Sequence, residues 1–417
     1  MDYMHSKDIY KTIRDVLKLL DLRVINHGTR TAYILYKMLL CQGKYEMFEI
    51  ADLAFLATIH DIGSFKTDYM ADPLVYETRD TMSHSIYGYL FVLYLLTPYK
   101  DMAKIILYHH TDYLQVPKTD YEYTDVIHML NVAEKMDIYS NILGSKFDYM
   151  MFQKQADSKL SSKALNLLYQ AERKYKIFDK LKSEEYIKEL DELFEYLVLT
   201  NEDKRNFLIG LIYCISFRSE YTMMDAVTCV AVCDTVAEKM YLNTHDKEVL
   251  YYSAILHDAG MTAISKDILE APRRLTDEEM KNLRSHVNIL NTILKDRIDK
   301  DCLNVINAHH ERGDGSGYPF KLRDAQMSLL QQILQVADVF TGLTAKRSYR
   351  PSKEKAQVIA ILRNEADNQR LNMSVVRTVI NYYEDIEKSV QAETKSMLSM
   401  YEKLQASYAQ TFKKVSK

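Results

Sequence analysis

Nine of the twelve histidines fall into two groups that lie about 200 residues apart. Each group contains one His-Asp pair and one His-His pair, at His60-Asp61 and His109-His110, and at His257-Asp258 and His309-His310. A single buried histidine is usually an ordinary core residue, but burying this many imidazoles without partners would be costly. A shared metal centre removes that cost. Histidine and aspartate without cysteine suit Fe, Mn and similar ions.

Such clusters favour phosphate-ester chemistry. A His-Asp pair can reach two metal ions, with the carboxylate as a bridge between them. Two adjacent ions generate a bound hydroxide at neutral pH and hold a phosphoryl group. They also offset the phosphate charge, which a chain with a formal net charge of -4 cannot do through its surface. We therefore expect phosphomonoester or phosphodiester hydrolysis, with two divalent metals per active site and Fe or Mn as the ions.

The spacing of equivalent residues indicates a long internal repeat. His60 and His257 are 197 residues apart, and His109 and His309 are 200 apart. The other pairs have similar offsets, which are 202 for His84 and His286, 201 for Asp137 and Asp338, and 198 for His27 and Asp225. One supersecondary plan used twice explains these offsets.

The apolar residues around these positions predict the helices that place them. Met102, Ile105 and Ile106 precede His109 with the i, i+3, i+4, i+7 spacing of one helix face, and residues 302–309 repeat the pattern. Only 11 glycines and 6 prolines are present, which favours helices. We predict an all-α fold of two tandem helical bundles, at residues 1–200 and 201–417. The first includes its closing and connecting helices, and the second ends in a helical tail.

The order His, His-Asp, His, His-His, Asp resembles the HD superfamily of phosphohydrolases, and the second half resembles its HD-GYP subfamily more closely. The resemblance spans about residues 220 to 385 and rests on LHDAGMTAISKDIL (256–269), LTDEEMKNLRSHVNIL (275–290), HHERGDGSGYPFKL (309–322) and ILQVADVFTGLTAKRSYRPS (333–352). It implies a helical fold with two HD domains, a di- or tri-metal site, and hydrolysis of cyclic di-GMP or a related cyclic dinucleotide.

The resemblance also assigns residues. The metal ligands of the second half would be Asp225, His257, Asp258, His286, His309, His310 and Asp338. Those of the first half would be His27, His60, Asp61, His84, His109, His110 and Asp137. Asp61 and Asp258 are the candidate catalytic carboxylates. The candidate substrate-binding residues are the motif loop Gly317, Tyr318 and Pro319 and the phosphate- or guanine-contacting arginines Arg312, Arg347 and Arg350.

Both halves depart from the family pattern. Asp225 stands where the family usually has histidine, although a carboxylate can still bind a hard metal. Met261 and Ser64 replace the lysine that would touch the substrate phosphate. Tyr221 replaces an acidic residue that helps to hold a third metal, so two metals are expected rather than three. The first half keeps every ligand but lacks the GYP loop.

Three functions remain open on the sequence. The leading one is a metal-dependent phosphodiesterase acting on cyclic di-GMP or a related cyclic dinucleotide. The second is a non-catalytic cyclic-dinucleotide-binding or scaffold protein with a degenerate GYP site. The third is an HD phosphohydrolase that acts on another nucleotide through the N-terminal site.

Composition limits the partners and the location. The weak net charge argues against DNA or RNA as a partner. The longest apolar stretches, at residues 90–96 and 207–217, are shorter than the roughly 20 residues that a membrane span needs. The start of the chain lacks the apolar run of a signal peptide, and the five cysteines suit a reducing compartment, so we expect a cytoplasmic protein. A heptad-spaced seam in residues 392–417 predicts either a homodimer contact or packing on its own domain.

Overall fold

The computed structural model describes all residues except 1, 68–80, 217–219, 346–350 and 416–417. The described residues form α-helices and short 3-10 helices, and they contain no β-strand. This confirms the predicted all-α fold. No helix in the described part of the chain is both long enough and apolar enough to cross a membrane.

The chain divides into two compact units. The N-terminal unit consists of Ile9–Gly210 together with Lys403–Lys417, and the C-terminal unit consists of Met1–Asp8 together with Leu211–Glu402. Each unit therefore takes a short segment from the far end of the chain. The consecutive ranges 1–200 and 201–417 do not include this exchange of ends.

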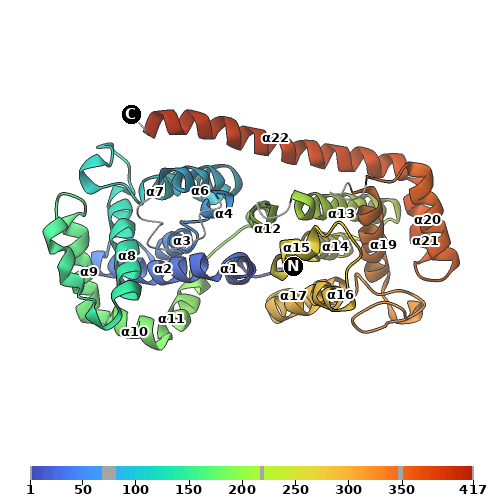
Figure 1. The fold of residues 1–417 in the computed structure, drawn as a ribbon, viewed down its shortest axis with the longest axis horizontal. Helices are drawn as coiled ribbons and strands as arrows, with labels where there is room; N and C mark the ends of the chain where they lie inside the picture. Colours follow the sequence, from blue (N-terminus) through green and yellow to red (C-terminus); the bar gives the residue numbers. More distant parts are fainter. Residues whose placement is uncertain (1, 68–80, 217–219, 346–350, 416–417) are drawn as a thin grey trace. The chain divides into compact units, whose positions relative to one another are not determined.

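Helices of the N-terminal unit supply its candidate ligands and their support (Figure 1). They are α1 (Ser6–Leu20), α2 (Leu22–Gln42), α3 (Met47–Thr58), α4 (Ser64–Thr67), α6 (Thr81–Leu95), α7 (Ala103–Tyr108), α8 (Thr124–Leu143), α9 (Ser162–Tyr175), α10 (Ile177–Ser183), α11 (Glu185–Leu193) and most of α12 (Asn201–Ser216). Short 3-10 helices are η1 (Thr97–Met102), η2 (Tyr113–Gln115), η3 (Gly144–Lys146), η4 (Tyr149–Gln155) and η5 (Phe194–Tyr196).

The C-terminal unit repeats this plan with fewer helices. They are α13 (Glu220–Lys239), α14 (Thr244–Leu256), α15 (Lys266–Leu269), α16 (Asp277–Arg284), α17 (His286–Leu294), α18 (Lys300–Asn307), α19 (Leu329–Thr344), α20 (Lys355–Asp367), α21 (Met373–Asn381) and the first part of α22 (Tyr383–Val415), with 3-10 helices η6 (Ala259–Ala263) and η7 (Asp324–Gln326).

Local sequence signals fix the ends of the ligand-bearing helices. At the start of α2, Asp21 accepts a hydrogen bond from the Arg23 backbone, and at its end Gly43 takes the left-handed conformation with a φ of 65°. A reciprocal capping box between Ser328 and Gln331 starts α19. These caps fix where α2 and α19 begin or end, and therefore which of their residues face inward.

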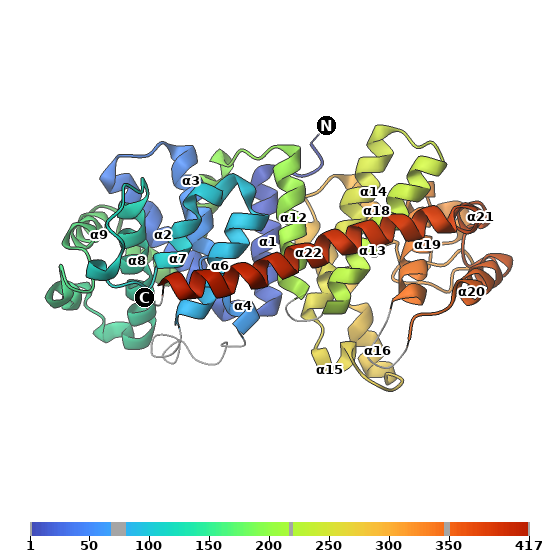
Figure 2. The same cartoon turned by 90° about the horizontal axis from the view of Figure 1, so that it is seen from above.

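The end of α22 packs within the N-terminal unit. Leu404 joins a buried cluster with Ile86, Leu90 and Leu107 from α6 and α7. The Tyr408 hydroxyl lies 2.9 Å from the Ser83 hydroxyl. Figure 2 shows this end of α22 alongside α6. The part of the predicted seam formed by Leu404 and Tyr408 thus packs on α6 and α7.

Candidate metal centres

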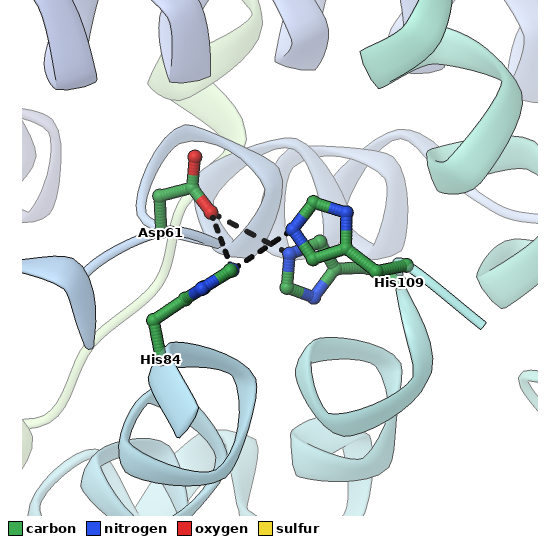
Figure 3. A group of neighbouring side chains, drawn as sticks. Asp61, His84 and His109 are labelled. Carbon is green, nitrogen blue, oxygen red and sulfur yellow. Dashed lines mark hydrogen bonds and ion pairs between the residues drawn. The ribbon is translucent and has the colours of Figure 1, made fainter. Parts of the chain in front are cut away.

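Asp61 is the hub of the first candidate centre. It follows α3, while His84 lies on α6 and His109 follows α7 directly. Its Oδ1 lies 3.4 Å from His84 Nε2 and 3.5 Å from His109 Nε2. Figure 3 shows the carboxylate and the two imidazoles pointing toward one another. With His110, these residues bring four ligand atoms within 4.8 Å of one another.

The other oxygen of Asp61 faces a second group of ligand atoms. Oδ2 lies 3.3 Å from His60 Nε2 and 3.9 Å from His27 Nε2. Ligand atoms of His27, His60 and Glu134 also lie within 4.8 Å of one another. One carboxylate therefore faces two ligand groups, one with each oxygen, which is the arrangement that a bridging carboxylate needs.

Asp137 lies beside this pair of groups and is not part of either. Its Oδ2 accepts a 2.8 Å hydrogen bond from His27 Nδ1, and its Oδ1 accepts a 2.5 Å bond from Arg30 Nε. Asp137 therefore orients His27 so that the Nε2 atom faces the cluster. A carboxylate in this position fixes the tautomer of a histidine ligand.

The pKa values of the groups in the first centre are shifted in different directions. Burial lowers the pKa of His60 to about 3, so this imidazole is neutral. Burial alone would raise the pKa of Asp61, but His60, His109 and His84 hold it well below its usual value. Burial also raises the pKa of Glu134 to about 7. Metal binding to this set competes with protons and releases them.

The C-terminal unit has the same hub. Asp258 Oδ1 lies 3.5 Å from His286 Nε2 and 3.7 Å from His309 Nε2, and its Oδ2 lies 3.5 Å from His257 Nε2. His310 Nδ1 lies 3.3 Å from Asp338 Oδ2. The two ligand groups here are Asp258, His286, His309 and His310, and His257, Asp258 and Asp338.

Neighbouring charges shift the pKa values of two candidate ligands in the C-terminal unit, Asp338 and His257. Burial opposes ionisation of Asp338, but His310 and His257 lower its pKa to about 2. Burial likewise opposes protonation of His257, but Asp258 and other nearby groups raise its pKa to about 9. His257 and Asp338 thus favour each other's charged forms. A divalent cation would replace the proton on His257.

The backbone of both units holds the imidazoles in the same way. His60 and His257 each direct Nδ1 to a carbonyl three residues earlier, at 2.7 Å in both units. His109 and His309 do the same at 2.6 Å. Each Nε2 is thereby turned toward the hub aspartate. Equivalent histidines of the internal repeat thus make equivalent hydrogen bonds to the backbone.

A glycine after each His-Asp pair lets the next ligand-bearing helix approach. A Cβ at Gly63 would lie 2.0 Å from the His84 carbonyl oxygen, and one at Gly260 would lie 2.3 Å from that of His286. Neither distance is sterically possible, so both positions require glycine. The glycine in the third position after each histidine is a packing requirement of the site.

The motif loop covers the second centre from one side. The ring of Tyr318 packs on that of His310, with centroids 4.8 Å apart, and its backbone N–H donates to the His310 carbonyl at 3.2 Å. Gly317 lies so close to the chain that a Cβ would be 2.4 Å from Arg312 N. Pro319 follows Tyr318 through a cis peptide bond. The loop thus places an aromatic ring against a candidate ligand.

Glu311 anchors this loop from beneath. Its fully buried carboxylate accepts backbone hydrogen bonds from Phe320 at 2.6 Å, Lys321 at 3.1 Å and Leu322 at 2.8 Å. The backbone oxygen of Glu311 is bonded by the Gln335 amide. A buried carboxylate that accepts several backbone N–H groups is a strong tether.

Two arginines flank Tyr318. The Arg284 guanidinium lies 4.9 Å from the centroid of the Tyr318 ring. Arg312 donates to the Glu311 carbonyl at 3.0 Å and, after His310 and His257, helps to lower the pKa of Asp338 against the effect of burial. Both cations therefore stand next to the second centre.

Most predicted ligands converge, and a few predicted residues do not. Asp225 is buried on α13, but it is not in either group of converging ligand atoms among the described residues. Arg347 and Arg350 lie outside the described residues, and so does the side chain of Tyr221. Glu134, Glu311 and Arg284 were not predicted. Glu134 lies one helical turn before Asp137, and Glu311 follows the His-His pair, so their positions were the available signal.

The clusters have the unsatisfied donors and acceptors that a metal would complete. Several buried ligand atoms have no hydrogen-bond partner within the described part of the chain, namely His27 Nε2, His60 Nε2, Asp61 Oδ1, His109 Nε2, Glu134 Oε2, Asp258 Oδ1 and His310 Nε2. Buried polar atoms are normally paired. These atoms belong to residues of the two clusters, and a cation between them would complete their interactions, so the residues fit a metal cofactor.

Comparison with known proteins adds the following. The family model for an HD domain matches residues 211–375. A 3'3'-cGAMP-specific phosphodiesterase 1 of Vibrio cholerae is 25% identical over 86% of this chain and 88% of its own. A cyclic di-GMP phosphodiesterase of Pseudomonas aeruginosa is 33% identical over 37% of each chain. A cyclic di-GMP phosphodiesterase response regulator of Xanthomonas campestris is 32% identical over 39% of this chain and 43% of its own.

One solved structure resembles the whole fold. It is the crystal structure of a cyclic GMP-AMP-specific phosphodiesterase of V. cholerae, with a TM-score of 0.58 over 92% of this chain and 98% of that chain. The sequence identity is 14%, so this likeness concerns the fold alone.

Proposed function

We propose that this chain, whose residues 211–375 match an HD-domain family model, is an HD-GYP metal-dependent phosphodiesterase that hydrolyses a cyclic dinucleotide. The observation that carries the proposal is the second centre. There, Asp258 and four histidines converge beside a motif loop whose Tyr318 packs on His310. Relatives named as cyclic GMP-AMP and cyclic di-GMP phosphodiesterases support the substrate class.

The ligand geometry supports two divalent ions per centre. Each hub aspartate directs one oxygen to each of two ligand groups. Two ions in such a site lower the pKa of water and neutralise phosphate charge. Nitrogen and carboxylate ligands without thiolate suit Mn²⁺ or Fe²⁺. We propose that Asp258, His286, His309 and His310 hold one ion and that His257, Asp258 and Asp338 hold the other.

The protein's own cations would orient the substrate. Met261 cannot contact a phosphate electrostatically, so another cation is needed near the ions. Arg284 lies over the Tyr318 ring, and Arg312 is bonded to the Glu311 carbonyl next to His310, so both cations lie near the candidate ligands. We propose that these arginines contact the phosphates, and we retain Arg347 and Arg350 as further candidates.

The direct test is hydrolysis by protein loaded anaerobically with Mn²⁺ or Fe²⁺. Cyclic di-GMP and 3'3'-cGAMP are incubated separately, and linear dinucleotide and mononucleotide are measured by chromatography. We expect hydrolysis of at least one of them by the wild-type chain, and a loss of at least 100-fold when His257 and Asp258 are both replaced by alanine. Replacing His60 and Asp61 in the same way is the matched control in the other unit.

The alternatives give different outcomes in the same experiment. If only the His60/Asp61 variant loses activity, the N-terminal centre is the active one. If the substrate binds in calorimetry but is recovered intact with both metals tested, the protein is a binding module. Either result would overturn the assignment of hydrolysis to the second centre.

A further inference from the structure

We propose that the N-terminal unit has a metal centre of its own in which Glu134, rather than Asp137, supplies the carboxylate ligand from α8. The inference rests on the metal-dependent function proposed above, because it uses the same two-ion logic. It adds a ligand that the sequence pattern does not assign. It also gives Asp137 and Arg30 a positioning role.

Glu134 is placed as a ligand. Its side chain is 1% exposed, and its Oε1 lies 3.0 Å from His110 Nδ1. Its Oε2 is buried and has no hydrogen-bond partner among the residues that the structure describes. One of its oxygens lies within 4.8 Å of ligand nitrogens of both His27 and His60. A buried carboxylate oxygen without a donor is costly, and a cation held between Glu134, His27 and His60 would remove that cost.

Asp137 is already engaged by other groups. Its two oxygens bind His27 Nδ1 and Arg30 Nε, and Asn141 donates to Oδ2 at 3.2 Å. The salt bridge with Arg30 neutralises the negative charge of Asp137, which would otherwise attract a metal ion. Asp137 therefore acts through His27, whose Nε2 it turns toward the cluster.

The C-terminal unit explains why the two helices differ. There the equivalent of Asp137 is Asp338, which lies in the ligand group with His257 and Asp258. The equivalent of Arg30, at the offset of His27 and Asp225, is the uncharged Thr228. The equivalent of Glu134 is Gln335, whose amide binds the Glu311 carbonyl.

The carboxylate ligand thus comes from different turns of two equivalent helices, namely Glu134 on α8 and Asp338 on α19. Residues i and i+3 share a helix face, so Glu134 and Asp137 both point inward. The longer side chain of Glu134 reaches the cluster from one turn earlier. Asp137 instead forms a salt bridge with Arg30. The ligand class remains a hard divalent ion, held by imidazole and carboxylate.

The test counts ions in the N-terminal unit of the full-length chain. The His257→Ala/Asp258→Asn double variant serves as background, because it disables the second centre. Mn²⁺ is loaded anaerobically, and metal content is measured after gel filtration and by calorimetry. We expect about two ions per chain in this background, as for a dinuclear site. Adding Glu134→Gln should leave about one ion, with the spin-coupled Mn²⁺ resonance replaced by that of an isolated ion.

Asp137→Asn separates the ligand from its support. We expect this variant to keep both ions, with one bound roughly 10- to 100-fold more weakly, as is usual when a group behind a histidine ligand is changed. The exposed Glu122→Gln, just before α8, is the matched carboxylate control and should change nothing. Metal-free thermal unfolding of each variant shows whether it folds.

The inference is overturned if the background binds no ions, or if Asp137→Asn loses an ion while Glu134→Gln keeps both. Should Glu134→Gln fold poorly, the Asp137→Asn result still decides, since a ligand aspartate would lose its ion. Ion counts do not depend on turnover. A chain that hydrolyses no cyclic dinucleotide but shows the expected counts would therefore refute the proposed function and leave this inference standing.

Discussion

At the scale of single residues, the motif loop depends on one carboxylate outside the ligand set. Glu311 follows the His-His pair and accepts three backbone N–H groups from residues 320–322. Its own position is held by Gln335, which binds its carbonyl oxygen. Tyr318 can rest on His310 only while the chain after Pro319 stays on this anchor.

Replacing Glu311 with glutamine should therefore displace the loop. The amide has one acceptor oxygen, and its NH₂ group would face backbone donors. We expect a loss of about 2 kcal/mol in the free energy of unfolding, the scale of hydrogen bonds to a buried charge. We also expect a fall of roughly tenfold or more in kcat/KM, mostly through KM, since the metal ligands remain. Denaturant unfolding and steady-state kinetics measure the two effects.

A matched control for Glu311 is available in the same unit. Glu278 is exposed on α16, and Glu278→Gln should leave both stability and kcat/KM within experimental error. Equal kcat/KM values for Glu311→Gln and the wild type would show that the loop does not need its anchor.

Residue types and spacing indicated most of the residues that converge on Asp61 and Asp258, but they did not indicate Glu134. His60, His84 and His109 are unambiguous because few residue types end an inward stripe and bind metal. Asp137 and Glu134 are both inward-facing acids on one helix, and the sequence cannot say which one Arg30 neutralises. That choice depends on the packing of α2 against α8, a contact between residues more than 100 positions apart.

At the scale of helices, one ion-pair network ties α2 to α10 and α11. Glu189 on α11 forms a salt bridge with Lys37 Nζ at 2.7 Å and accepts a hydrogen bond from the Tyr33 hydroxyl at 3.0 Å. It also forms a close salt bridge with Lys180. Lys37 is buried and lies over the Tyr36 ring at 3.8 Å. Since α2 also holds His27, this network helps to set the position of a candidate ligand.

We expect Glu189→Gln to cost about 3 kcal/mol at pH 7, because Lys37 would keep a buried charge without its partner. Burial opposes ionisation of Glu189, but Lys180 and Lys37 lower its pKa to about 2 from the ordinary 4.5. A depressed pKa means that the contribution is present above pH 4.5 and is lost as the pH falls toward 2. Urea unfolding at several pH values should show the wild type and the variant converging between pH 5 and pH 2. A difference that stays constant over this range would contradict the assignment.

The helices themselves were predictable from periodicity, and their junctions were less so. The stripe of Ile105 and Ile106 predicts a helix before His109, and α7 does end at Tyr108. The packing of each His-Asp turn against the next helix was not predictable, since it depends on the missing Cβ of Gly63 and Gly260. The presence of a glycine in the sequence does not reveal which backbone segment packs against it.

At the scale of the whole molecule, the repeat in the sequence predicted two units but not the exchange of their ends. The N-terminal unit includes Lys403–Lys417, and the C-terminal unit includes Met1–Asp8. In the C-terminal unit, the Tyr3 ring stacks on Tyr252, and its carbonyl accepts from Asp299 N at 2.7 Å. Matching offsets show that a plan is repeated, but they do not show which unit each end segment packs with.

The exchange makes the N-terminal unit dependent on the last residues of the chain. Leu404 is 6% exposed among Ile86, Leu90 and Leu107, and α6 also carries His84. Leu404→Ala should cost about 3 kcal/mol, as expected for a large-to-small change in a core. Hydrogen exchange should accelerate in α6 and α7 and remain unchanged in α13 and α14. Leu398→Ala, on the same helix but 49% exposed, should cost under about 0.5 kcal/mol. Faster exchange confined to α13 and α14 in the Leu404 variant would mean that the tail belongs energetically to the other unit.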